Sequence, residues 1–83
     1  MMTESKTLDA RGLRCPLPVL KARKALKDLA DGDILRVLAT DPGAVKDFEA
    51  FCRTTGHRLL ESRAGDGAFD FTIEKTAPPS AGG

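Results

Sequence analysis

The carboxyl-terminal part of the chain contains an alternation of apolar and polar residues that is compatible with only a few folds. Residues 69 to 74 read Phe-Asp-Phe-Thr-Ile-Glu. Side chains of a strand point alternately to opposite faces, so this segment predicts a strand with one buried and one solvent-facing side. A sheet built on such a strand is covered on one face only, and we therefore expect all helices on a single side of it.

The rest of the chain supplies the helices and strands for that arrangement. We expect, in chain order, a strand over 6–10, a helix over 16–29, a central strand over 34–39, a helix over 42–55, a strand over 57–62 and a hairpin turn over 64–67. Proline is favoured in the first turn of a helix, so Pro16 and Pro42 mark the helix starts, with Asp41 as the cap of the second; Gly56 ends it. The predicted fold class is α/β, a two-layer βαβαββ sandwich with two helices on one face of a four-stranded mixed sheet.

Helical projection assigns a core face to each helix. At 100° per residue, the apolar positions that share one side are Val19, Ala22, Ala25, Leu26 and Leu29 in the first helix and Ala44, Val45, Phe48, Phe51 and Cys52 in the second. Cys52 is therefore expected to pack in the core. His57, at the start of the third strand, is expected to lie at the surface or to pack in the hairpin, and not to act as a base for Cys15.

Composition limits the classes of protein that fit. The 83 residues hold two cysteines, which are too few for a disulfide scaffold and lack the paired spacing of a zinc site. We expect no metal and no cofactor. No signal peptide or apolar run of roughly 20 residues is present, which predicts a cytoplasmic protein without membrane association. Residues 6–75 are expected to form one domain, between a flexible start at 1–5 and a disordered tail at 76–83.

The segment from Gly12 to Pro18 reads Gly-Leu-Arg-Cys-Pro-Leu-Pro and places one thiol at the start of the first helix. The positive end of the helix dipole favours the thiolate of Cys15, as does Arg14. Pro16 and Pro18 lack the N–H groups that would otherwise face the sulfur, so we predict a moderately acidified thiol. The prolines also restrict the backbone and keep the sulfur exposed.

Pro18 stands where a Cys-x-x-Cys protein has its resolving cysteine. A resolving thiol expels an adduct by forming a disulfide. Without one, an adduct on Cys15 waits for an external acceptor, and the pattern predicts a carrier thiol in place of a redox switch.

Residues 8–18 resemble the signature of the TusA/SirA-like sulfur-carrier family, in which a Cys-Pro-x-Pro motif opens the first helix of a βαβαββ sandwich. The resemblance spans residues 6–75 and includes Asp41-Pro42 and Phe51-Cys52. It implies that Cys15 accepts a sulfane sulfur as a persulfide from a cysteine desulfurase or rhodanese-type donor and passes it to a relay protein, with no independent turnover. Similar carriers serve tRNA thiolation, molybdenum-cofactor synthesis and sulfur oxidation.

Other residues of the segment have supporting or partner-binding roles in this interpretation. Asp9 and Gly12 match the family pattern, and Asp9 either braces the loop before Cys15 or takes part in the chemistry. Leu17 stands where some members have Glu. Leu17 and Leu20 fall among Lys21, Lys24 and Lys27 on the outer side of the first helix, which favours a docking surface for an acidic partner. A monomer is expected when the protein is free.

Rival functions have weaker support in the sequence. The basic first helix favours a small nucleic-acid-binding or regulatory module, but aromatic residues make up only 5% of the chain, with no Trp or Tyr for base stacking, and the net charge is +1. Gly82-Gly83 is typical of ubiquitin-like carriers that hold sulfur as a thiocarboxylate, whose fold begins with a hairpin. A thiol–disulfide oxidoreductase needs a resolving cysteine, and a metal chaperone needs two soft ligands close together.

Overall fold

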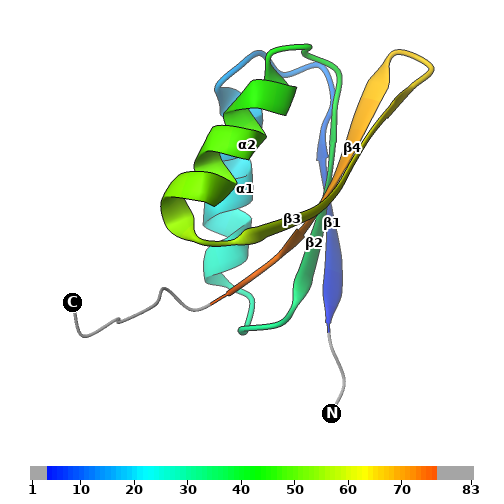
Figure 1. Cartoon of the computed structure of the whole chain (residues 1–83). Helices are drawn as coiled ribbons and strands as arrows, with labels where there is room; N and C mark the ends of the chain where they lie inside the picture. The colour runs from blue at the N-terminus through cyan, green and yellow to red at the C-terminus, as the bar shows by residue number, and fades with distance from the viewer. Residues whose placement is uncertain (1–3, 77–83) are drawn as a thin grey trace.

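The computed structural model describes residues 4–76 and contains two helices and four strands within that range (Figure 1). Their bounds in chain order are β1 (Ser5–Ala10), α1 (Leu17–Lys27), β2 (Ile34–Ala39), α2 (Ala44–Thr55), β3 (Arg58–Gly65) and β4 (Ala68–Glu74). Both helices lie on the same side of the sheet, so the predicted two-layer βαβαββ sandwich is confirmed.

The sheet is mixed, with strand order β1-β2-β4-β3. β1 and β2 are parallel, whereas β4 pairs antiparallel with β2 and with β3. The apolar run over 34–39 is a central strand, as predicted. Because β1 and β2 are parallel, their carboxyl ends meet at one edge of the sheet, and the loops that lead into α1 and α2 lie together at the top of Figure 1.

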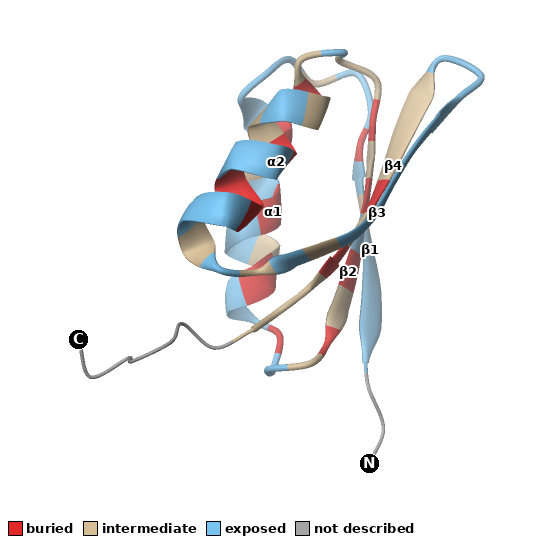
Figure 2. Ribbon diagram, viewed as in Figure 1, coloured by how far each residue is buried: buried red, intermediate tan, exposed pale blue. Residues whose placement is uncertain are grey.

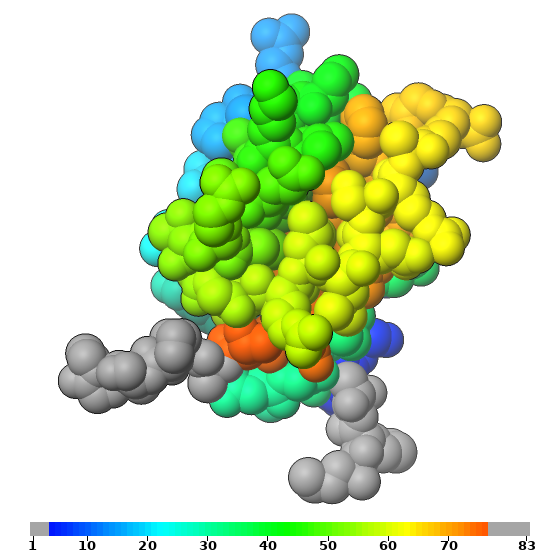
Figure 3. Space-filling view, viewed as in Figure 1, coloured from blue at the N-terminus to red at the C-terminus, as the bar shows by residue number. Residues whose placement is uncertain are grey.

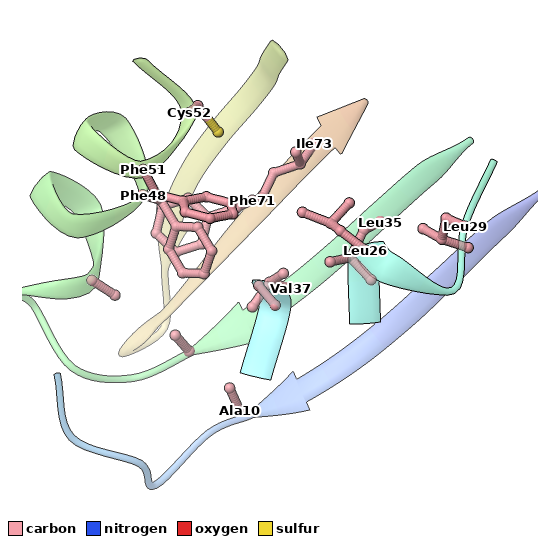
Figure 4. Close-up of a cluster of buried hydrophobic side chains, with 13 residues drawn as sticks. Ala10, Leu26, Leu29, Leu35, Val37, Phe48, Phe51, Cys52, Phe71 and Ile73 are labelled. Atoms are coloured by element: carbon pink, nitrogen blue, oxygen red, sulfur yellow. The ribbon is translucent and has the colours of Figure 1, made fainter. Parts of the chain in front are cut away.

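The core lies between the helices and the sheet (Figure 2). Phe71 and Ile73 of β4 are fully buried, which confirms the face assigned from the alternation. The ring of Phe71 stacks on Phe48 of α2 with 4.6 Å between centroids (Figure 4). On the opposite face of the sheet, Arg36 of β2 pairs with Asp70 of β4. The polar positions of β4 therefore face away from the helices, as expected.

Both helices begin later than the sequence predicts. α1 begins at Leu17, and α2 begins at Ala44, with Gly43 at its cap position. The prediction that Asp41 caps α2 is wrong: its side chain accepts the N–H of Gly43 within the preceding loop, at 3.0 Å. At the other end, α2 stops where predicted, because Gly56 adopts a left-handed conformation with φ of 87°.

The hairpin between β3 and β4 is tighter than predicted. The strands extend to Gly65 and from Ala68, which leaves a two-residue turn of Asp66 and Gly67, both with positive φ. An Asp-Gly pair of this kind matches the twist of the flanking strands, so the strands continue further than the apolar pattern indicates. Figure 3 shows β3 beside α2 on one face of the molecule.

Residues 1–3 and 77–83 lie outside the described residues, and with them Gly82-Gly83 and most of the predicted flexible start and disordered tail. Thr76, at the first position of that predicted tail, donates its N–H to Nδ1 of His57 at 3.2 Å. Within residues 4–76, neither helix has the length and apolar character needed to cross a membrane.

Candidate functional site

Cys15 lies in the loop between β1 and α1, at the sheet edge where the two parallel strands end. Residues of the loop between β2 and α2 form hydrogen bonds with the Cys15 loop. The N–H of Gly12 donates to Oγ1 of Thr40 at 2.9 Å, and the N–H of Cys15 donates to the carboxylate of Asp41. Residues that are 26 to 28 positions apart along the chain thus fix the thiol-bearing loop.

The thiol itself is exposed but not isolated. Its Sγ–H donates to the carboxylate of Asp47, in the first turn of α2. Gly43 lies against it: a Cβ at this position would lie 3.7 Å from the Cys15 Sγ and 3.5 Å from Oδ1 of Asp41. Cys15 therefore sits between the amino-terminal ends of both helices, with carboxylates of Asp41 and Asp47 beside it.

These neighbours contradict the prediction that the pKa of Cys15 is lowered. The hydrogen bond to Asp47 raises the pKa of Cys15 to about 11. Desolvation and the negative charges of Asp47 and Asp41 act in the same direction. Negative charge beside a thiol disfavours the thiolate. One first-turn donor of α1 is also occupied, because the N–H of Leu17 is bonded to the Arg14 carbonyl at 2.8 Å. Arg14 acts instead on Asp41, whose pKa is lowered chiefly by the backbone N–H groups it accepts.

The two prolines of the motif occupy different environments. Pro16 is exposed and directly precedes the first helical residue, and Pro18 is fully buried in the first turn of α1. Pro18 therefore anchors the start of the helix in the core at the position where an oxidoreductase would present its second thiol. No described cysteine takes that place, because Cys52 is only 6% exposed on the core side of α2. Burial raises the pKa of Cys52 to about 11.

Asp9, near the end of β1, makes its side-chain contacts with Arg11, two residues further along the chain. Its two carboxylate oxygens accept hydrogen bonds from Nε and a terminal nitrogen of the Arg11 guanidinium, each at 2.9 Å. One of these oxygens also accepts the backbone N–H of Arg11 at 3.1 Å. These bonds lower the pKa of Asp9 to about 2. His57 is remote from the thiol, because Asp47 lies in the first turn of α2 and His57 follows its carboxyl end. The helix from Asp47 to Thr55 alone spans about 12 Å at 1.5 Å per residue. Desolvation by partial burial lowers the pKa of His57.

The apolar residues that the sequence places on the outer side of α1 are exposed. Leu17 is 45% and Leu20 is 51% exposed. The lysines around them, Lys21, Lys24 and Lys27, are exposed as well. Leu17 and Leu20 lie in the first turn of α1, the end nearest to Cys15, whereas Lys24 and Lys27 lie in its last turn.

Sequence reasoning missed Asp47 and the contact of Asp41 with Cys15. One signal was available: β1 and β2 were expected in one sheet with a helix after each, and parallel neighbours place their following loops side by side. Asp41 and the first turn of the second helix could then have been placed near the thiol. Periodicity alone does not reveal this, because Asp47 is 32 residues from Cys15.

Comparison with known proteins finds relatives that match most of this chain. A candidate sulfur carrier protein of Neisseria meningitidis serogroup A is 57% identical over 70 residues, which cover 84% of this chain and 95% of that protein. The sulfur carrier protein TusA of Allochromatium vinosum is 54% identical over 69 residues, which cover 83% of this chain and 91% of that protein.

Among solved structures, a SirA-like protein from Desulfitobacterium hafniense superposes with a TM-score of 0.77 at 30% identity, over 87% of this chain and 99% of the other. The family model described as sulfurtransferase TusA matches residues 6–75, which is nearly the whole described range. This chain therefore belongs to the TusA sulfurtransferase family.

Proposed function

We propose that this protein is a sulfur carrier that holds sulfane sulfur as a persulfide on Cys15, between a donor and an acceptor protein. The family and the named sulfur carriers among its relatives support the carrier role. The single observation that supports the choice of residue is the position of Cys15, an exposed thiol held by two loops at one edge of the sheet. The other cysteine, Cys52, is buried.

The transfer needs no oxidant. The Cys15 sulfur, as thiolate, forms a bond to the outer sulfur of the donor persulfide, and the sulfur–sulfur bond of the donor breaks. The electron pair leaves with the donor thiolate, which takes up a proton equivalent to the one that Cys15 lost. The products are a Cys15 persulfide and a donor thiol, and the same exchange in reverse order delivers the sulfur to an acceptor.

Retention of the sulfur follows from the neighbourhood of the thiol. With Pro18 buried at the fourth position of the motif and Cys52 buried in the core, no second thiol of residues 4–76 is placed to expel the bound sulfur as a disulfide. A cysteine desulfurase or a rhodanese-type protein supplies the sulfur in this proposal. The outer face of α1, with Leu17, Leu20 and the adjacent lysines, receives the partner.

The assignment predicts opposite results for the two cysteines. After incubation with a cysteine desulfurase and cysteine, or with polysulfide, intact-mass spectrometry of the wild type is expected to show one added sulfur that a reductant removes. Cys15→Ser is expected to fold and to gain no sulfur. Cys52→Ala is expected to gain it normally and to lose a few tenths to about 2 kcal/mol of stability. Sulfur on the Cys15→Ser protein would refute the assignment.

A further inference from the structure

Two carboxylates stand beside the reactive sulfur. The Asp47 carboxylate accepts the Sγ–H of Cys15, and the Asp41 carboxylate accepts its backbone N–H. Both aspartates are partly exposed, so a partner can reach them from solvent. Within residues 4–76, neither one forms an ion pair with a Lys or Arg.

The other charged groups around the thiol do not offset this pair. Arg14, next to Cys15 in the same loop, is exposed and acts on Asp41. Arg23 of α1 lines a groove between the helices together with Pro16 and Asp47, but it makes no ion pair with Asp47 in the described structure. The charges that act on the Cys15 sulfur are thus those of Asp47 and Asp41.

We propose that Asp41 and Asp47 keep Cys15 as an unreactive thiol in the free protein, and that a cationic side chain of the sulfur donor releases the thiolate by pairing with Asp47. This inference rests on the proposed carrier function. A positive charge within about 4 to 6 Å of a thiol favours the thiolate, so pairing reverses the effect of the carboxylates. The freed thiolate then carries out the exchange written above, and the proton leaves with the donor thiol.

The arrangement also defines the kind of partner surface that fits. The outer face of α1 is basic, whereas the immediate surroundings of the thiol are acidic. A complementary partner has an acidic surface facing the lysines and a cation at its reactive sulfur. Two opposite charges at fixed separation favour one orientation of docking and disfavour like-charged partners.

Alkylation of Cys15, measured without any sulfur donor, tests whether the two aspartates keep the thiol protonated in the free protein. The rate of alkylation by iodoacetamide is followed against pH, and its midpoint reports the pKa of Cys15. Wild type is expected to react with a midpoint near 11, and Asp47→Asn with a midpoint shifted toward 9. At about pH 8 this raises the alkylation rate by roughly tenfold, since the lower intrinsic nucleophilicity offsets part of the gain in thiolate.

Glu49→Gln provides the matched control, because Glu49 is an exposed carboxylate on the same helix. Its midpoint is expected to equal that of the wild type. Asp47→Ala is a second variant in case Asp47→Asn does not fold, as judged by circular dichroism. An unchanged midpoint in the folded Asp47 variants would overturn the proposal.

The second half of the proposal is tested with two synthetic peptides that carry a cysteine persulfide, one flanked by arginines and the other by alanines. Wild type and Glu49→Gln are expected to accept sulfur severalfold faster from the arginine peptide. Asp47→Asn is expected to lose most of this preference. An equal preference in wild type and Asp47→Asn would refute the role of a cation at Asp47. Absence of transfer to wild-type Cys15 from both peptides and from polysulfide would count against the carrier function instead, and the alkylation profile would still report on the carboxylates.

Discussion

At the scale of single residues, the environment of Cys15 determines its chemistry more than its identity does. A cysteine before a helix is ordinarily expected to be acidified. Here the Asp47 carboxylate accepts the thiol hydrogen bond, and the N–H of Leu17, the first residue of α1, is bonded to a carbonyl. A carrier benefits from this arrangement, because a thiol that stays protonated until a partner arrives is protected from alkylation and oxidation.

Gly43 offers a test of how tightly the thiol is enclosed. Its φ of −67° is open to any residue, and an added Cβ would lie at 3.5 Å from the Cys15 Cβ, an ordinary contact distance. We expect Gly43→Ala to raise the free energy of unfolding by about 0.4 to 1 kcal/mol, because the unfolded chain loses freedom. Urea denaturation measures the change. A loss of stability would show that the loop does not tolerate a methyl group beside the thiol.

At the scale of elements, the site depends on where the two helices begin and end. Both start one or two residues later than the prolines indicate, which leaves Asp41 in a loop where it bonds to Cys15. The loops can meet because β1 and β2 are parallel neighbours. The end of α2 is set differently, by the conformation of Gly56.

Gly56→Ala is the counterpart of the previous variant at the other end of α2. Gly56 has φ of 87° and donates its N–H to the Cys52 carbonyl at 2.9 Å. An alanine in the left-handed region costs about 1 to 2 kcal/mol, so we expect the free energy of unfolding to fall by that amount. The urea midpoint of the two variants should therefore move in opposite directions. Unchanged stability in Gly56→Ala would mean that the helix end adjusts without cost.

At the scale of the whole molecule, charge is unevenly distributed. Residues 1–30 hold seven basic and three acidic residues, and the remainder holds six basic and nine acidic. The sheet face opposite the helices carries cross-strand ion pairs, such as Arg58 with Glu74 at 3.7 Å, so much of its charge is balanced. The outer side of α1 carries the basic surface, and the first turn of this helix is the end nearest to Cys15.

Reversal of charge on this surface tests its role in docking. Lys24→Glu combined with Lys27→Glu is expected to slow sulfur transfer from a cysteine desulfurase by roughly tenfold at low ionic strength, with the difference shrinking as salt is added. Arg53→Glu combined with Arg63→Glu changes the net charge equally, away from α1, and serves as the control. Equal rates for the two double variants would remove the lysine surface from the proposal.

The order of elements, the buried face of β4 and the burial of Cys52 could be predicted from the sequence, because periodicity and turn residues act over a few neighbouring positions. The face of β4 and the burial of Cys52 confirm this. The reactivity of the thiol could not, since it depends on Asp41 and Asp47, 26 and 32 residues away. Only the parallel pairing of β1 with β2 brings those carboxylates to the sulfur, and electrostatic effects act through space and not along the chain.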